Sequence, residues 1–217
     1  MKLFIDSGNI KDIETLAAIG IIDGVTTNPT LLAKEPGDYR DNLKKICQIV
    51  KGPVSGEVTA VDVNGILQQG HDIAKIDQYM VVKVPLTRAG IQACKALSGE
   101  GIRVNVTLCF SAAQALLAAK AGATYISPFV GRLDDVGTTG MALIKEIVEI
   151  YNNYDFTTEI LVASCRNPIH VIEAARMGAD IATCPPAVID QLFNHPLTNI
   201  GLEKFLKDWE KSQTVKA

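Results

Sequence analysis

The chain has 217 residues, of which 47% are hydrophobic, so it is long enough to bury one sizeable core without disulfides or a metal to hold it. Its formal net charge of −3 argues against a nucleic-acid or anionic-membrane surface, because such surfaces need clustered lysine and arginine. We therefore expect a single domain over residues 1–217 that acts on small molecules, with no nucleic-acid partner and no membrane partner.

The chain opens with MKLFIDSGNI, in which an apolar run of three residues stops at Asp6. We expect neither a signal peptide nor a membrane anchor from this pattern, since no stretch approaches the roughly 20 apolar residues of a bilayer span. The five cysteines are an odd number without a CxxC pair, and the three histidines lack the spacing of a helical metal site. We therefore expect a cytoplasmic protein that needs no metal and no cofactor.

Short β-branched and apolar runs alternate along the chain with longer segments of helical periodicity. Residues typical of helix N-caps, among them Asp38, Thr87 and Ser111, precede several of the helical segments. Eight such βα repeats favour a closed (β/α)8 TIM barrel over an open doubly wound sheet, which usually has fewer strands. The predicted strands are 2–6, 23–27, 54–59, 80–85, 102–107, 123–128, 159–164 and 180–184.

An additional C-terminal helix is predicted at about 198–212, beyond the eighth repeat. It carries Leu202, Phe205, Leu206 and Trp209 at helical spacing. The helix is expected either to seal the barrel or to dock on a neighbouring subunit.

Polar residues end or closely follow most of the predicted strands. In a barrel of this class the chemistry lies at the carboxyl ends of the strands, so these residues form the candidate site. Asn105 and Thr107 are two positions apart and point to the same side of the sheet. The set comprises Asp6, Thr26, Asn28, Glu57, Lys83, Asn105, Thr107, Ser127 and Ser164.

Lys83 is the sharpest of these signals, because valines surround it in a strand that should be buried on both faces. Burial disfavours a charged ammonium and so favours the neutral amine, which is a nucleophile. The alternative is a buried salt bridge of Lys83 with Glu57 or Asp6 alone, which leaves the other polar strand ends unexplained.

Asp6 and Glu57 are carboxylates on different strands that face one lumen, an arrangement typical of a general acid/base and a group that positions water. A helix N-cap beside Ser7 is an alternative role for Asp6. Asn28 followed by Pro29 is typical of a helix cap, and a cap residue can also hold substrate.

Arg132 and Arg166 follow the sixth and seventh predicted strands, and two guanidinium groups above the barrel mouth suit a phosphate. The alternative for Arg132 is a surface salt bridge with Asp134 or Asp135. Cys165 lies close to the same site but lacks a histidine that would suggest a thiolate pair, so we do not expect a cysteine nucleophile.

The chain closely resembles the transaldolase family, in particular its compact members, which include the fructose-6-phosphate aldolases. The resemblance spans Met1 to Trp209 and implies a TIM barrel with a Schiff-base lysine on the fourth strand, where Lys83 stands. It is carried by FID at 4–6, GVTTNPTLL at 24–32, GPVSGEV at 52–58, VVKVPLT at 81–87, NVTLCFS at 105–111, YISPFVGRLDD at 125–135 and ILVASCRNP at 160–168.

The resemblance implies that Lys83 attacks the C2 ketone of a ketose phosphate, while the residues Glu57 and Thr107 position a water that helps to form the imine. Asp6 then takes the C4 hydroxyl proton, the C3–C4 bond breaks, and a dihydroxyacetone unit stays bound to the lysine.

The resemblance also implies the substrates, which are sedoheptulose 7-phosphate or fructose 6-phosphate as donor and glyceraldehyde 3-phosphate or erythrose 4-phosphate as acceptor, as in the pentose phosphate pathway. Substrate hydroxyls are assigned to Asn28, Asn105 and Ser127. The phosphate is assigned to Arg132, Ser164 and Arg166, and Thr26 and Phe129 complete the substrate site.

Two alternatives to a transaldolase stay open. The fructose-6-phosphate aldolases resemble one another in carrying glutamine at the position of Glu57 and tyrosine at that of Phe129, so both positions favour a transferase. A catalytically inactive sugar-phosphate binding protein would need the arginines and asparagines but not Lys83. The compact members also form homo-oligomers, pentamers or decamers, in which the C-terminal helix crosses to a neighbour.

Overall fold

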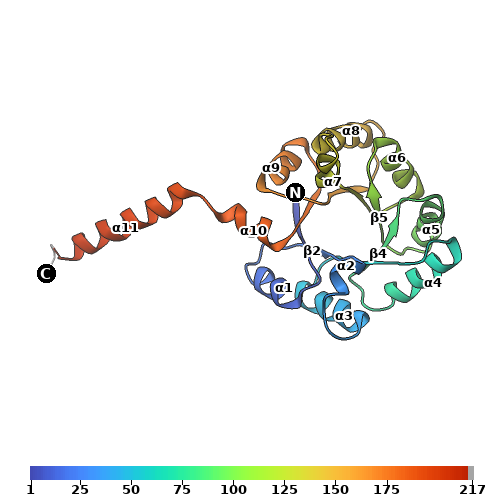
Figure 1. The fold of residues 1–217 in the computed structure, drawn as a ribbon, viewed down its shortest axis with the longest axis horizontal. Coiled ribbons are helices and arrows are strands. Elements are labelled where there is room, and N and C mark those ends of the chain that lie inside the picture. Colours follow the sequence, from blue (N-terminus) through green and yellow to red (C-terminus); the bar gives the residue numbers. More distant parts are fainter. Residues whose placement is uncertain (215–217) are drawn as a thin grey trace.

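The computed structural model describes residues 1–214, within which the strands form a closed barrel in chain order (Figure 1). All neighbouring strands are parallel, and β8 pairs with β1 to close the ring. The predicted (β/α)8 barrel is therefore confirmed. The strands are β1 (Lys2–Asp6), β2 (Gly24–Thr26), β3 (Val54–Glu57), β4 (Met80–Pro85), β5 (Val104–Cys109), β6 (Tyr125–Pro128), β7 (Glu159–Val162) and β8 (Ile181–Cys184).

Helices lie between consecutive strands and surround the barrel (Figure 1). Asp38, Thr87 and Ser111 each accept a hydrogen bond from a backbone N–H of the first turn, as expected of N-caps. The helices are α1 (Ile10–Ala17), α2 (Pro29–Leu32), α3 (Tyr39–Val50), α4 (Val63–Ala74), α5 (Arg88–Gly99), α6 (Ala112–Ala121), α7 (Val130–Asp135), α8 (Gly140–Asn153), α9 (Pro168–Met177), α10 (Pro186–Phe193) and α11 (Pro196–Thr214).

Strand side chains alternate between two apolar layers. The larger layer lies between the sheet and the helices and contains strand residues such as Val82 and Val84. The smaller one fills the amino-terminal half of the lumen, and we call it the lumen plug. It consists of Phe4, Val81, Tyr125, Leu161, Ala163 and Ile181.

The lumen plug is packed closely around Phe4. The rings of Phe4 and Tyr125 meet edge to face with centroids 6.3 Å apart. Gly24 of β2 leaves the space that the Phe4 ring needs, since a Cβ at this position would lie 2.6 Å from Phe4 Cζ. Side chains of the lumen plug therefore close the amino-terminal end of the lumen.

Helix α11 leaves the barrel and projects into solvent (Figure 1). The side chains of Phe205 and Trp209 are 72% and 65% exposed. The helix lies where the sequence predicted one, at about 198–212, but the expectation that it seals the barrel is wrong for this structure. Among the helices of residues 1–214, none is both long and apolar enough to cross a bilayer.

Candidate active site

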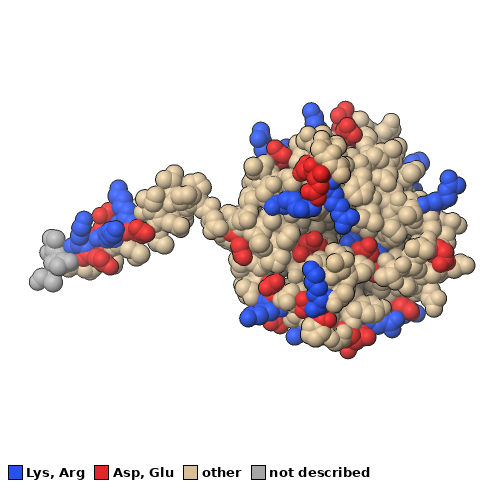
Figure 2. Space-filling view, viewed as in Figure 1, with Lys and Arg blue, Asp and Glu red and all other residues tan. Residues whose placement is uncertain are grey.

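Two adjoining cavities open at the carboxyl ends of the strands and meet at Lys83. The smaller holds about 160 Å³ and reaches Asp6, and the larger holds about 450 Å³ and reaches Glu57 and Thr107. Asn28, Phe129, Arg132 and Lys83 line both. Acidic and basic side chains face one another across the hollow at the centre of this face (Figure 2). The structure thus gathers the polar strand ends into one site.

Lys83 lies in the lumen, where its residue is only 4% exposed. Its Nζ lies 3.0 Å from Glu57 Oε2 and donates a hydrogen bond of 2.9 Å to the carbonyl oxygen of Thr27. The register of β3 and β4 places Glu57 directly beside Lys83, which accounts for the ion pair. The salt bridge considered from the sequence is therefore present, but it is part of a larger polar cluster that opens to both cavities.

Asp6 ends β1 and faces the same space. Its carboxylate accepts a hydrogen bond of 2.8 Å from Thr26 Oγ1. Burial raises the pKa of Asp6 above its ordinary value, while the charge of Lys83 and the Thr26 hydrogen bond act to lower it. The N-cap role considered for Asp6 is wrong, because Asn9 accepts the capping bond of α1.

Asn105 and Ser127 form a buried hydrogen-bonded layer beside Lys83. Ser127 Oγ donates to Asn105 Oδ1 at 2.7 Å, and Asn105 Nδ2 donates to Ser55 Oγ at 3.1 Å. These bonds fix the orientation of the Asn105 amide. Ser127 lines the smaller cavity, so this layer can present a hydroxyl to a ligand there.

Thr107 differs from its neighbours because its hydroxyl has no hydrogen-bond partner. Among the buried side-chain nitrogen and oxygen atoms of residues 1–214, only Thr107 Oγ1 is in this state. Such a group is rare in proteins and often marks a ligand or water site. The residue lines the larger cavity together with Glu57 and Lys83. Its hydroxyl is therefore available to a molecule bound beside the lysine.

Two residues at the rim hold a backbone conformation that side chains other than glycine rarely adopt. Leu108 has φ of 62° and Ser164 has φ of 59°. Leu108 lies in the irregular part of β5, between Val106 and Cys109, where the register with β6 shifts. Strained positions of this kind cluster at ligand sites, and each of these two residues lines one of the cavities.

Asn28 caps α2, with Pro29 in the first helical turn as the sequence predicted. Its Oδ1 accepts the backbone N–H of Leu31 at 2.9 Å. The capping bond uses the carbonyl of the side chain, so the amide nitrogen can still donate to a ligand in the cavities that Asn28 lines.

Arg132, Ser164 and Arg166 lie together above the smaller cavity. The Arg132 guanidinium carbon lies 4.9 Å from the centroid of the Phe129 ring. The alternative pairing of Arg132 with Asp134 or Asp135 is wrong: Asp134 Oδ2 lies 3.0 Å from His170 Nε2, and Asp135 Oδ2 lies 2.8 Å from Arg166 Nη2. Arg132 thus keeps its guanidinium for a ligand.

Thr183 and Ser55 contact residues of the candidate site but were not predicted from the sequence. Thr183 Oγ1 lies 2.7 Å from Thr26 Oγ1 and lines the smaller cavity. Ser55 receives the Asn105 amide. Both lie inside short strands rather than after them. The spacing of Thr183 is the sequence signal that could have identified it, because Thr183 lies two positions beyond the plug residue Ile181, as Lys83 does beyond Val81.

The cysteines are buried free thiols, and the surroundings of Cys165 make its thiol unreactive. Its hydrogen bond with Cys184, its burial and the charge of Asp6 all raise its pKa, which disfavours the thiolate. Within the described part of the chain, no group of three histidine, cysteine or acidic residues has the geometry to hold a metal ion.

Comparison with known proteins relates the chain to one family along nearly all of its length. Residues 3–216 match the family model described as Transaldolase/Fructose-6-phosphate aldolase. The chain is 59% identical over 211 residues to a probable transaldolase of Anaeromyxobacter dehalogenans, with 97% of each chain covered. It is 59% identical over 212 residues to one of Caldicellulosiruptor saccharolyticus and 56% over 210 residues to one of Methanococcus vannielii, covering 97% of this chain and 98% of each relative.

Proposed function

Because the chain belongs to the transaldolase/fructose-6-phosphate aldolase family, we propose that it is a transaldolase which transfers a dihydroxyacetone unit through a Schiff base on Lys83. The observation that carries the proposal is the setting of the Lys83 amine, which lies 3.0 Å from Glu57 and shares its cavities with Asp6 and Thr107. A protein that only binds sugar phosphates needs no buried amine between two carboxylates. This argues against the inactive binding protein.

Imine formation would begin at the Lys83–Glu57 pair. The amine must be neutral to attack the C2 carbonyl of the ketose, and Glu57 Oε2 at 3.0 Å is placed to accept its proton. Attack gives a carbinolamine, which loses water to become the imine. Thr107 Oγ1 lines the same cavity with its hydrogen-bonding capacity unused, so Glu57 and Thr107 can hold the water that carries the proton.

Asp6 would act as the base that breaks the carbon–carbon bond. It takes the proton of the C4 hydroxyl, the electrons of the C3–C4 bond flow into the imine, and an aldose phosphate leaves. Its raised pKa makes it a better proton acceptor than an ordinary aspartate, and Thr26 holds the carboxylate in place. In the second half of the cycle Asp6 returns the proton as the acceptor aldehyde is attacked.

The rim supplies groups of the kind that a phosphorylated sugar needs. Arg132, Ser164 and Arg166 would bind the phosphate, because guanidinium groups bind phosphate oxygens through paired hydrogen bonds. The donors proposed are sedoheptulose 7-phosphate and fructose 6-phosphate, and the acceptors are glyceraldehyde 3-phosphate and erythrose 4-phosphate. The hydroxyls of the sugar would be held by Thr26, Asn28, Asn105 and Ser127.

Transfer rather than simple cleavage is supported by Phe129. Its ring packs edge to face on Phe110, with centroids 5.9 Å apart, and lies beneath Arg132. Phenylalanine has no hydroxyl with which to help water protonate the bound three-carbon intermediate, so the intermediate would wait for an acceptor aldehyde. If fructose 6-phosphate alone released dihydroxyacetone as fast as erythrose 4-phosphate stimulated transfer, the protein would be a fructose-6-phosphate aldolase instead.

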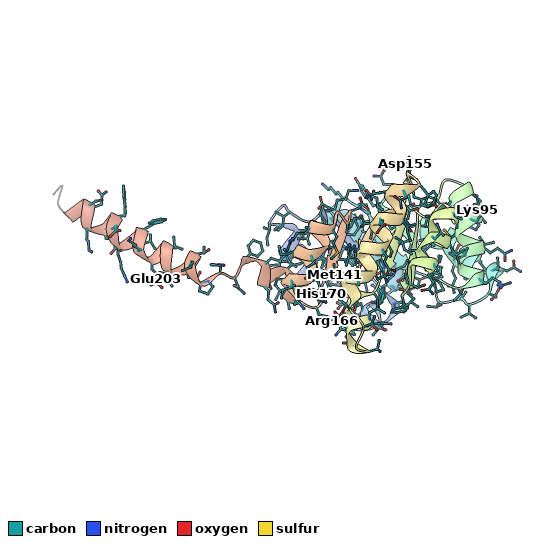
Figure 3. All side chains as sticks on the ribbon, turned by 90° about the horizontal axis from the view of Figure 1, so that it is seen from above. Lys95, Met141, Asp155, Arg166, His170 and Glu203 are labelled. Carbon is teal, nitrogen blue, oxygen red and sulfur yellow. The ribbon has the colours of Figure 1, made fainter. Side chains whose placement is uncertain are left out.

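The experiment that tests the covalent mechanism is borohydride trapping in the presence of fructose 6-phosphate, followed by peptide mass mapping. We expect a reduced dihydroxyacetone adduct on the peptide that contains Lys83, and none in Lys83→Met. Lys95→Met is the matched control, because Lys95 lies exposed on α5 (Figure 3), and it should be labelled like the unmodified protein. An adduct on another lysine would contradict the assignment.

We also propose that the enzyme works in the cytoplasm as a homo-oligomer, a pentamer or decamer. Support comes from α11, whose Leu202, Phe205, Leu206 and Trp209 are left exposed by residues 1–214. Removal of residues 196–217 should convert the assembly to smaller species in analytical ultracentrifugation. If the truncated protein forms an assembly with the same number of subunits, this role of the helix is contradicted.

A further inference from the structure

The proposed phosphate-binding residues come from two separate loops at the barrel rim, the β6–α8 loop, which contains the short helix α7, and the β7–α9 loop. The two loops must be held together for both arginines to reach one ligand. Arg132 lies on α7, whereas Ser164 and Arg166 lie between β7 and α9. The Gly131 N–H donates a 3.1 Å hydrogen bond to the Ser164 carbonyl oxygen. A side chain at Gly131 would collide with this oxygen and with the Arg166 side chain, so the loops are in direct contact here.

His170 connects the same two loops from beneath. It lies in the first turn of α9 and its residue is 8% exposed. Its Nδ1 accepts the backbone N–H of Arg166 at 3.2 Å, and its Nε2 lies 3.0 Å from Asp134 Oδ2 on α7. Figure 3 shows Arg166 and His170 close together at one face of the barrel, with Asp155 at the opposite face.

The two contacts determine which ring nitrogen carries the proton. Since Nδ1 accepts an N–H, the proton of the neutral ring is on Nε2 and points to Asp134. The other carboxylate oxygen of Asp134 accepts the Gly140 N–H at 2.8 Å, which orients the carboxylate. A single imidazole in one tautomer therefore joins the backbone of Arg166 to α7.

Helix α7 also contacts the Arg166 side chain, through the residue next to Asp134. Asp135 Oδ2 lies 2.8 Å from Arg166 Nη2, and Arg166 Nε lies 3.5 Å from Ser164 Oγ. The exposed Asp135 contact can exchange for a phosphate, because a surface ion pair contributes little free energy. The hydrogen bond from the Arg166 N–H to His170 does not involve the guanidinium, so it does not compete with a change of the guanidinium's partner.

We propose that His170 is a positioning residue for phosphate recognition: it holds Arg166 and α7 in the relative position that lets Arg132 and Arg166 bind one phosphate group. The inference rests on the proposed function for the identity of the substrate. It goes beyond that function because His170 lines neither cavity and has no part in the chemistry at Lys83.

Two substitutions separate the contacts of the ring. His170→Asn keeps an acceptor near the position of Nδ1 and loses the contact with Asp134, whereas His170→Gln keeps a donor near Nε2 and loses the contact with Arg166. Loss of one hydrogen bond should weaken binding of inorganic phosphate, followed by ³¹P NMR titration, about three- to tenfold. The KM for fructose 6-phosphate should rise by a similar factor, while kcat/KM for unphosphorylated fructose stays at the unsubstituted value.

His71→Asn is the matched control, since His71 is a surface histidine whose Nε2 lies 2.7 Å from Glu100 Oε2. It should change none of these quantities. If a His170 variant does not fold, Asp134→Asn tests the same link. The amide introduced by this substitution can still accept the Gly140 N–H through its oxygen, but its NH₂ group favours the other His170 tautomer, which cannot accept from Arg166.

Two results would overturn the inference. One is unchanged phosphate binding in the folded variants. The other is an equal loss of kcat/KM for fructose and for fructose 6-phosphate, which would indicate a purely structural role of His170. A protein that binds phosphate in a His170-dependent way but transfers no dihydroxyacetone would refute the proposed function and leave this inference standing. A protein that transfers the unit without dependence on His170 would refute this inference alone.

Discussion

The two halves of the barrel lumen are built from the same strands but have opposite chemistry. Phe4, Val81, Tyr125 and Ile181 close the amino-terminal half as an apolar plug. Two positions further along the same strands lie Asp6, Lys83, Ser127 and Thr183, which line the smaller cavity. Because side chains alternate along a strand, a step of two residues keeps the direction and changes only the height in the barrel.

The comparison shows how the fold separates stability from function. The plug residues are buried, and apolar burial stabilises the protein by roughly 25 cal/mol per Å². The residues above them place an amine and carboxylates near one another in a poorly solvated space, which is unfavourable for stability. Substitutions in the plug should therefore alter the free energy of unfolding, and those in the upper layer should alter turnover.

The largest expected effect is that of Lys83→Met, which removes the proposed nucleophile at nearly constant volume. We expect kcat for transfer to fall by at least about 10⁴-fold, because the covalent route is lost, while far-UV circular dichroism stays that of a folded barrel. Lys95→Met should retain full activity. Substantial turnover in Lys83→Met would refute the division between the two halves.

Asp6→Asn should lower kcat about 10²- to 10⁴-fold, as expected for loss of a general base. In the unsubstituted protein the burial of Asp6 raises its pKa, so the acid limb of the profile of kcat/KM against pH should lie above the ordinary aspartate range. This limb should be absent from the residual activity of Asp6→Asn.

The same substitution should stabilise the fold. A carboxyl group whose pKa is raised in the folded state holds its proton more tightly there, so its contribution to stability falls as pH rises through the folded pKa. The urea midpoint of Asp6→Asn should therefore exceed that of the unsubstituted protein by more at pH 7 than near pH 3. A difference in urea midpoint that grows toward acid pH would contradict the raised pKa of Asp6.

Gly24→Ala tests the plug alone. The added methyl group would lie 2.6 Å from Phe4 Cζ and 2.7 Å from the Pro53 carbonyl oxygen. Neither can move freely, because the Phe4 ring is packed in the plug and the Pro53 oxygen accepts the Val25 N–H at 2.9 Å. We expect a loss of about 1–3 kcal/mol in the free energy of unfolding, measured in urea, with the activity of the folded protein retained.

Gly99→Ala provides the control for this substitution. A Cβ at Gly99, the last residue of α5, would have no neighbour within 4 Å. Its effect on the free energy of unfolding should be neutral or favourable by about 0.4–1 kcal/mol, since alanine restricts the unfolded chain. If Gly24→Ala and Gly99→Ala destabilise the protein equally, the effect of Gly24→Ala does not come from the lost space around Phe4.

The strands could be predicted from the sequence because they are short apolar runs between periodic helices. β1 and β4 have the predicted bounds, whereas β5 continues past the predicted end at residue 107 to Cys109. That extension includes the register shift and the positive φ of Leu108. Both occur where β5 pairs with β6, and a leucine at this position does not predict either of them. The exposed path of α11 could not be predicted either, because amphipathic periodicity does not specify which apolar surface a helix covers.

The strand-end rule predicted the polar residues of the candidate site but could not determine which of them form pairs. The pairing of Glu57 with Lys83 follows from the register of β3 and β4, which the strand ranges alone do not fix to one residue. The partners of Asp134 and His170 depend on two loops that are distant in sequence. Thr183 was missed because a threonine inside a β-strand is ordinary.

The smallest expected effect is that of Thr183→Val, which tests how the upper layer holds Asp6. Thr26 Oγ1 donates its proton to Asp6, so in its 2.7 Å contact with Thr183 Oγ1 it must accept, and Thr183 must donate. The chain runs from Thr183 through Thr26 to the carboxylate. Hydrogen bonds in such a chain strengthen one another, and each favours the ionised form of Asp6.

Valine has nearly the shape of threonine and leaves the packing around Ile181 and Thr26 intact, but it removes the donor. We expect kcat/KM to fall about three- to tenfold, the effect of one lost hydrogen bond, with the acid limb displaced to higher pH because ionised Asp6 is less well stabilised. Thr15→Val, on the exposed face of α1, should change neither quantity. A loss of activity without displacement of the limb would mean that Thr183 acts on the substrate directly, since a residue acting through Asp6 must alter its titration.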